Sequence, residues 1–371
     1  MTGKRAIMLF FFTVLIPGCL VPCAAGMKER PAVNVQEIIL GHLKDSYQWH
    51  FFDIGEKQIA LPLPVIVHSR ERGWYVFLSS RLEDHHGYRG FYIATEGMSE
   101  GKIVERNSAG NEVRPFDISI TKNVVALFFS CGLLMILVIR LAGWYKKREK
   151  EGDADAVPNG LKGAMEWFIM SIYDGVIKKC VGRDYKRYAP YLLTAFFFIF
   201  LNNVLGLVPI FPAGANLTGN IAITMGLAFF TMIAINLFGN KAYWKEILWP
   251  NVPVFMKAPV PIMQVIEFFG ILTKPIALMI RLFANIFAGH IIILALTSLV
   301  FLTVAMGPVV NASMSAASVL FSVFMMILEL LVAYIQAYVF TMLSAIFIGL
   351  SRSEHHGDAP VNLNIKPENV Q

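Results

Sequence analysis

The sequence predicts an all-α polytopic membrane protein with about five spans, an amphipathic cytoplasmic helix and an exported N-terminal segment of mostly β or irregular structure. Its composition points to this class, because the 371 residues are 56% hydrophobic and only 16% charged. Soluble proteins carry about 25% charged residues. In addition, the apolar residues gather in long runs between residues 124 and 350, as bilayer-crossing helices require. The composition excludes a disordered chain and disfavours a soluble enzyme.

The charge and cysteine content exclude several other classes. The net charge is +6, but the cations do not form a patch interleaved with aromatic residues, so no nucleic-acid partner is expected. The four cysteines show no CxxC motif and no Cys/His ligand spacing. They therefore predict neither a disulfide framework nor a metal site, and no cofactor is expected.

The first 25 residues have the layout of a secretory signal peptide. Two basic residues precede an apolar run over residues 6–16, and small residues continue up to Ala25. Because the run is too short to span a bilayer, we expect cleavage near Ala25 and export of the segment after it. Lipid attachment at Cys19 and an uncleaved interfacial anchor remain as alternatives.

Residues 26–118 form the exported segment, which is more polar than the rest. Two β-rich stretches, residues 60–67 and 74–79, flank a turn-like sequence and predict a hairpin, whereas the Gly-rich residues 87–110 predict turns. Histidines in this segment make a metal site conceivable, but their spacing matches no ligand pattern and favours solvated surface residues. These histidines are His42, His50, His68, His85 and His86.

The membrane domain is expected over residues 119–351, and its first three spans are predicted at residues 124–145, 191–211 and 221–238. The loop between the first two spans carries ten Lys and Arg residues, whereas the connector 212–220 has no charge. By the positive-inside rule, the first span therefore runs from outside to inside. Within the basic loop, residues 161–181 predict an amphipathic helix on the membrane surface.

Two longer apolar blocks come next, at residues 262–306 and 309–350. As helices they would be roughly 68 and 63 Å long, whereas the hydrocarbon core is about 30 Å thick. Each block fits either two spans or one tilted helix. Since no polar or Pro/Gly turn divides them decisively, we favour two long, steeply tilted helices that form a hairpin through Gly307 and Pro308. Residues 352–371 then form a cytoplasmic tail.

Few charged residues interrupt these last two blocks. They are Glu267, Lys274, Arg281 and Glu329, and His290 is the only histidine in any predicted span. A charge at the bilayer centre costs about 2.5–3.5 kcal/mol on insertion scales, so such residues indicate a pathway, a relay or a partner. The alternative is an internal ion pair that only holds the bundle together.

Helical spacing separates these polar residues into faces. Arg281 and Asn285 share a face, whereas His290 is turned by about 900° from Arg281 and lies nearly opposite. Glu329 and Gln336 are seven residues apart and share a face of the last helix. An imidazole and a carboxylate can relay protons near neutral pH. A guanidinium stays charged and can only block or displace them.

The stretch TKPIALMIRLFANIFAGH at residues 273–290 resembles the signature of subunit a of bacterial F-type ATP synthases. That family shows a Lys-Pro pair, an Arg-Leu-Phe-x-Asn core, and then Ala-Gly with a polar residue. The pair Asn202-Asn203 with Leu-Val-Pro at 207–209, the Gln-Ala-Tyr sequence at 336–338 and the tail sequence SEHH at 353–356 are similar as well. The resemblance covers residues 124–356.

The resemblance implies a proton-translocating stator subunit with two half-channels, placed in the bacterial inner membrane. Its partners would be the ring of c subunits, the b subunits of the peripheral stalk, the rest of the complex and the lipid bilayer. The implied roles fall into three groups along the proton path. Arg281 would face the c-ring with support from Asn285 and Gln336, His290 and Glu329 would line the outer half-channel, and Glu267 and Lys274 would lie toward the inner one.

Two features depart from the family pattern. Some members have the acid after Ala-Gly and the histidine on the last helix, whereas this chain has them exchanged. The common bacterial form also lacks so long an N-terminal segment as residues 26–118.

Two other functions fit the sequence less well. A secondary transporter with an Arg-bound anionic substrate would predict inverted repeats, and the sequence has no internal repeat. An intramembrane hydrolase would need a motif such as H-E-x-x-H or G-x-S-x-G, and neither occurs. No Walker-type phosphate loop occurs either, so the chain is expected to be a non-catalytic subunit.

Overall fold

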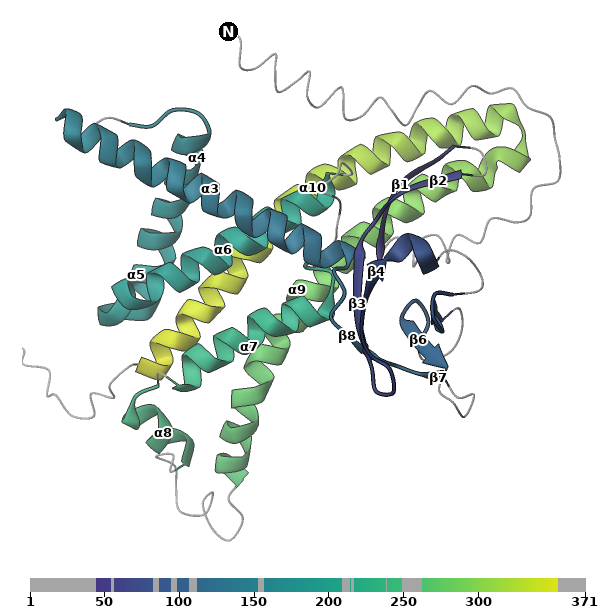
Figure 1. Ribbon diagram of the computed structural model, residues 1–371. Coiled ribbons are helices and arrows are strands. Elements are labelled where there is room, and N and C mark those ends of the chain that lie inside the picture. The colour runs from purple at the N-terminus through teal and green to yellow at the C-terminus, as the bar shows by residue number, and fades with distance from the viewer. Residues whose placement is uncertain are drawn as a thin grey trace, which may run out of the picture.

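A computed structural model describes residues 45–352, apart from 55–56, 83–86, 95–98, 107–111, 153–156, 209–213, 215–216, 238 and 249–261. The predicted signal peptide, the tail sequence SEHH, Pro209 and three of the five histidines (His42, His85 and His86) lie outside the described residues. Helices dominate the described chain, and its strands gather at the end of the molecule opposite α5 and α8 (Figure 1).

The N-terminal segment forms three small antiparallel sheets, in the orders β1-β2, β4-β3-β8 and β5-β6-β7. The strands are β1 (Gln48–Ile54), β2 (Lys57–Pro62), β3 (Pro64–Ser69), β4 (Gly73–Leu78), β5 (Phe91–Ile93), β6 (Ile103–Arg106), β7 (Glu112–Val113) and β8 (Phe116–Asp117), with a 3-10 turn at Ser79–Leu82.

The predicted hairpin is present, but its first strand is shorter than expected. Strands β3 and β4 pair from Pro64 opposite Leu78 to Ser69 opposite Gly73. The stretch 60–67 is divided at Leu63, because residues 60–62 pair with β1 instead. Leu63 lies opposite Ser79: its N–H donates to the Ser79 hydroxyl at 3.1 Å and its carbonyl accepts from the Ser79 N–H at 3.0 Å. Residues 87–110 contain turns at Gly90 and Gly101, as expected, but strands β5 and β6 also pair within that range.

This segment is anchored to the start of the first membrane helix. Val65, Val67 and Phe91 are fully buried in its own core. The Asp45 carboxylate accepts the Asn123 N–H at 3.2 Å, which satisfies one of the free donors at the start of a helix. A second small apolar cluster joins the segment to the membrane bundle; its buried members are Trp49, Ala126 and Leu217.

The helical part begins with α3 (Lys122–Glu151) and continues through α4 (Leu161–Ile172), a π-helical turn (Tyr173–Ile177), α5 (Lys178–Val181), a 3-10 turn (Gly182–Asp184), α6 (Tyr185–Leu207), α7 (Ile221–Leu237) and α8 (Lys241–Leu248). Four helical segments of the described chain are long and apolar enough to cross a membrane, and the 17-residue α7 is a shorter apolar helix. These four segments are Lys122–Glu151, Leu161–Leu207, Gln264–Leu302 and Pro308–Arg352.

Two helices are longer than the predicted spans, because polar residues outside the apolar run continue the helix. Helix α3 extends through the basic residues 146–148, and α6 begins at Tyr185 rather than 191 and includes Pro190. The predicted amphipathic stretch 161–181 is helical, and its inner face carries Ile172 and Ile177, both fully buried in the main core. Helix α8 lies within the loop after the third predicted span.

The two long apolar blocks are one continuous helix each, α9 (Ile262–Leu302) and α10 (Pro308–Arg352). They form the predicted hairpin through a 3-10 turn (Thr303–Met306) and Gly307, whose φ of 102° closes the turn. Figure 1 shows them as an antiparallel pair that extends beyond the other helices. With 41 and 45 residues they are about 62 and 68 Å long.

A polar cluster ties the end of α10 to two other elements. The Arg352 guanidinium bonds the Asp184 carboxylate, with Nε donating to Oδ2 at 2.8 Å, and its Nη1 donates to Asn240 Oδ1 at 3.1 Å. The Asn240 side chain donates back to the Arg352 carbonyl at 2.9 Å. This contact joins the ends of α10 and α7 to the start of α6.

Candidate functional site

The polar residues of interest lie along the contact between α9 and α10. On α9, Leu278, Leu282 and Ile286 form a buried stripe at four-residue spacing, which packs this helix into the main core. Arg281 and His290 flank that stripe on opposite sides, as the helical rotation predicts. Arg281 is exposed, and His290 is half-buried.

His290 and Glu329 form a buried pair across the two helices. The Nδ1 atom of His290 lies 2.7 Å from Oε1 of Glu329, and the exposed fractions of the two side chains are 17% and 4%. The same Nδ1 lies 3.1 Å from the Ile286 carbonyl oxygen. With the carboxylate ionised, both neighbours are acceptors, so Nδ1 carries the proton. The imidazole also interacts with the backbone of Gly206 on α6.

Gly289 makes room for the Glu329 carboxylate. A Cβ atom at position 289 would lie 2.9 Å from Glu329 Oε1 and 3.0 Å from its Cδ, closer than carbon–oxygen packing permits. Because Gly289 has no side chain, the Glu329 carboxylate can lie against the backbone of α9 and reach the imidazole of His290. The Ala-Gly element of the sequence therefore has a steric role in this pair.

Asn285 and Gln336 connect the helices closer to Arg281. The Asn285 Nδ2 donates to Gln336 Oε1 at 3.2 Å, and Gln336 is 3% exposed. Asn285 is one helical turn from Arg281 on the same face. The bond fixes the rotation of α9 against α10 at this level, and so fixes the direction in which Arg281 points.

Arg281 and Lys274 border one cavity of about 310 Å³, which is also lined by Leu343 and Phe347 of α10. The Lys274 ammonium lies 5.8 Å from the centre of the Phe347 ring. In the described part of the chain, no carboxylate forms an ion pair with Arg281. The Arg281 guanidinium and the Lys274 ammonium thus border the same cavity, which is otherwise lined mostly by apolar side chains.

Glu267 does not join the other candidate residues. It lies near the start of α9, and its charge acts on Tyr243 of α8: burial, and then the negative charge of Glu267, raise the pKa of the Tyr243 phenol. Glu267, Lys274 and Arg281 are seven residues apart in turn, but among the described residues they form no ion pair with one another, as the alternative of an internal ion pair would require.

Buried polar atoms without partners mark a line along α10. Ser322 Oγ, Glu329 Oε2 and Gln336 Nε2 are buried and have no hydrogen-bond partner among the residues that the structure describes. The three residues are seven apart and share one face of α10. Orphaned buried polar groups are rare in folded proteins, and water commonly satisfies them. This line is suited to hold water between the helices.

Helix α6 adds a second polar group beside this line. The Asn203 side chain donates to the Ala333 carbonyl at 3.4 Å and accepts from the Thr218 hydroxyl at 2.6 Å, and all three residues are almost fully buried. Sequence analysis did not assign Asn203, Thr218 or Ser322 to the site. An uncharged Ser or Thr gives no hydropathy signal, whereas the Asn202-Asn203 pair was a signal that could have been used.

Described residues include no group of three or more His, Cys, Asp or Glu that would hold a metal ion. His68 instead packs edge-on against Trp74, with ring centres 4.8 Å apart. The site contains one imidazole–carboxylate pair, an amide bridge and an exposed guanidinium. This set can bind, pass and repel protons.

Two protein families match this chain, one over the helical part and one over the strand-containing N-terminal part. The family described as "ATP synthase A chain" matches residues 125–349, which is more than half of the chain. The family described as "Domain of unknown function (DUF8433)" matches residues 38–122. The first match includes all helices of the site, and the second covers the strands.

Several curated relatives carry the same name. The chain is 43% identical over 249 residues to "ATP synthase subunit a" of Chlorobium phaeobacteroides strain DSM 266, covering 66% of this chain and 68% of that one. It is 40% identical over 255 residues to the protein of that name from Chloroherpeton thalassium, covering 67% and 71%. It is 44% identical over 246 residues to that of Pelodictyon phaeoclathratiforme, covering 65% and 67%. The chain belongs to the ATP synthase A chain family, subunit a of the F-type ATP synthases.

Proposed function

We propose that this chain is the proton-translocating stator subunit of its ATP synthase and that Arg281 is its essential arginine. The observation that carries the proposal is the exposed guanidinium of Arg281 beside exposed apolar residues such as Ile280 and Ile276. An unpaired charge facing lipid is costly. A carboxylate on a neighbouring chain, a c subunit of the rotating ring, would relieve that cost.

The pair His290 and Glu329 would deliver protons through the outer half-channel. Their separation of 2.7 Å allows direct proton exchange, and the unpartnered polar atoms of Ser322 and Gln336 would hold the water that extends the path. The exchanged order of acid and histidine preserves one proton acceptor on each helix.

The cavity beside Arg281 and Lys274 would open toward the inner half-channel, with Glu267 nearer its mouth. A proton from the outer side neutralises a ring carboxylate, and the neutral site can then enter lipid as the ring turns. When the site meets Arg281, the fixed cation favours its ionised form and the proton leaves to the other side. Because Arg281 keeps its own proton at any working pH, it also prevents direct passage between the half-channels.

The proposed organisation is a signal peptide (1–25), a periplasmic segment (26–118), a membrane domain (119–351) with five spans, and a cytoplasmic tail (352–371). Its support is the alternation of basic and uncharged loops and the packing of the strand segment against the start of the first span. The b subunits of the peripheral stalk and the c-ring are the expected contacts within the inner membrane.

Replacement of Arg281 tests the proposal in inverted membrane vesicles. ATP-driven acidification, monitored with a pH-sensitive dye, is expected to be lost in both Arg281→Ala and Arg281→Lys. The lysine variant should fail because a desolvated ammonium can release its proton and lacks the planar fork. Arg183→Lys, an exposed arginine outside the site, is the matched control and should pump normally. Pumping by Arg281→Lys at the wild-type rate would show that Arg281 is structural.

A further inference from the structure

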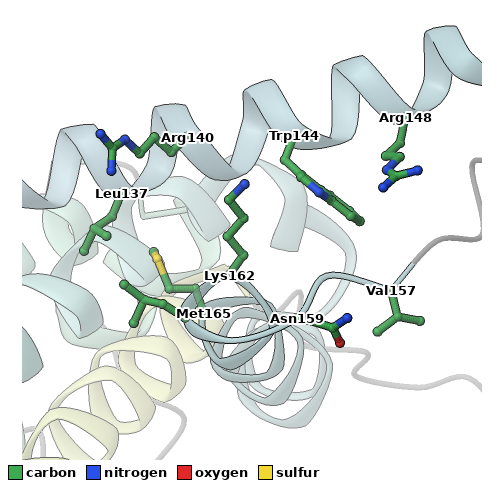
Figure 2. Close-up of a pocket in the computed structure, with 9 residues that line it drawn as sticks. Leu137, Arg140, Trp144, Arg148, Val157, Asn159, Lys162 and Met165 are labelled. Atoms are coloured by element: carbon green, nitrogen blue, oxygen red, sulfur yellow. The ribbon is translucent and has the colours of Figure 1, made fainter. Parts of the chain in front are cut away.

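A second cavity lies away from the proton path, between the end of α3 and the start of α4. Its volume is about 470 Å³. Figure 2 shows Lys162 rising from α4 toward α3, and Trp144 and Arg148 descending from α3 toward the loop at Asn159. The lining residues are Leu137, Arg140, Trp144, Arg148, Val157, Asn159, Leu161, Lys162 and Met165.

Among the described residues, the lining carries three cations, Arg140, Arg148 and Lys162, and no acidic residue. Within the described chain, Arg140 and Lys162 form no ion pair. Arg148 is drawn in part to Glu151, with Nη1 3.6 Å from its carboxylate, and its guanidinium lies 5.6 Å from the centre of the Trp144 ring. Cations from two helices thus converge on one hollow, and two of them, Arg140 and Lys162, have no ion-pair partner among the described residues.

The cavity has a fixed wall, because the chain before α4 folds back over the first turn of that helix. A Cβ atom at Gly163 would lie 2.3 Å from the Pro158 carbonyl oxygen, so only glycine permits this approach. Pro158 is buried, although its neighbours Val157 and Asn159 are exposed. The hollow is therefore built by packing and is not a gap between mobile side chains.

The cavity lies where the apolar surface of α3 gives way to its basic end. On α3 the lining runs from Leu137 to Arg148; Val138 and Ile139 are exposed apolar residues at the start of this range, and Lys146 and Lys147 lie near its end. Trp144 lies at the same level, as tryptophan does at membrane boundaries. An anion bound here would have water on one side and acyl chains on the other.

We propose that this cavity binds the phosphate of an anionic phospholipid headgroup. A phosphodiester offers oxygens in several directions, which suits two guanidinium groups and an ammonium from different helices. Leu137 and Met165 line the cavity on its apolar side, where the glycerol end of the lipid would lie. The bound lipid would hold α3 against α4, which also meet through the Tyr145 hydroxyl and the Glu166 carboxylate.

The test uses the intact membrane sector that contains this chain, purified in detergent and analysed by native mass spectrometry. The probe is phosphatidylglycerol, with phosphatidylcholine as the zwitterionic comparison. The double variant Arg140→Gln/Lys162→Gln should weaken phosphatidylglycerol binding at one site by about tenfold or more, since hydrogen bonds to charged groups are lost. The matched control Lys146→Gln/Lys150→Gln removes the same charge from exposed residues of α3 and should change binding less than twofold.

Glu151→Gln provides a variant that leaves the cavity lining intact. It removes the pair between Arg148 and Glu151, together with one negative charge beside the cavity, and should increase phosphatidylglycerol retention. Three outcomes would overturn the proposal: equal binding in the lining variant and the control, complete displacement of the lipid by about 10 mM inorganic phosphate, or attachment of a photo-crosslinker at position 157 to another subunit. The second outcome would indicate a site for free phosphate, and the third a protein contact.

Discussion

His290 on α9 and Glu329 on α10 form a hydrogen-bonding pair whose Nδ1 and Oε1 atoms lie 2.7 Å apart, in a part of the helix contact where Glu329 is almost fully buried. The pair places a group that titrates near neutral pH beside a carboxylate in a low-dielectric setting. Its two members come from different helices, so each can be replaced without altering the other helix.

Exchange of the two residues tests whether they act as one relay. His290→Ala and Glu329→Ala should each lower proton flux by about tenfold or more, in the range of lost acid–base groups, and the double variant should cost less than the sum. The exchange variant His290→Glu/Glu329→His should recover part of the flux. Passive flux through vesicles measures all four. Full flux in His290→Ala, together with an inactive exchange variant, would reject the relay.

Gly289→Ala should disturb the same pair without removing a polar group. The new Cβ would lie 2.9 Å from Glu329 Oε1, so the carboxylate must move away from His290. Overpacking of this kind costs about 1–3 kcal/mol, and we expect proton flux to fall several-fold while the protein still assembles. Glu329→Asp shortens the acid by one methylene and should restore flux in the Gly289→Ala background. A Gly289→Ala variant with normal flux would contradict the steric role.

The bond between Arg352 and Asp184 should contribute to the stability of the bundle. Asp184→Asn keeps the size of the side chain but removes the charge that Arg352 contacts, and no side-chain cap bond of α6 is lost because Asp184 makes none. We expect a loss of about 1 kcal/mol, measured by thermal unfolding in detergent. Asp174→Asn is the control, because its pair with Lys178 is longer, at 3.8 Å, and exposed. Equal effects of the two changes would rule out a special role for Arg352.

Cysteine labelling of spheroplasts tests the proposed orientation. In a background with all four cysteines replaced by serine, Arg70→Cys in the β3–β4 turn should react with an impermeant reagent. Asn364→Cys should react only after the membrane is permeabilised. The reason is that an odd number of spans places the two ends on opposite sides. Labelling of Asn364→Cys in intact spheroplasts would exclude the five-span topology. It would also exclude the interpretation that α9 and α10 each cross the membrane once as a tilted helix.

The sequence by itself determined the membrane class, the regions of the helices and the candidate polar residues. Hydropathy suffices for this, because the bilayer penalises every charge and every unsatisfied backbone group within it. The hairpin at Gly307 was predictable because the apolar blocks on either side of it contain few residues that break a helix. The Gly307-Pro308 pair was therefore the expected position of the turn. The resemblance of residues 273–290 to one family was carried by local sequence alone.

Only the tertiary structure decided which of these residues meet. Glu267 shares a heptad spacing with Arg281 but acts electrostatically on Tyr243 of α8, and Asp184 reaches Arg352 across 168 positions. Asn203 and Ser322, which have no charge to reveal them, join the site through α6 and α10. The physical reason is that contacts between helices depend on their crossing and relative rotation, which the packing of the whole bundle sets. Periodicity along one helix gives a residue its face, but not the neighbour that the face meets.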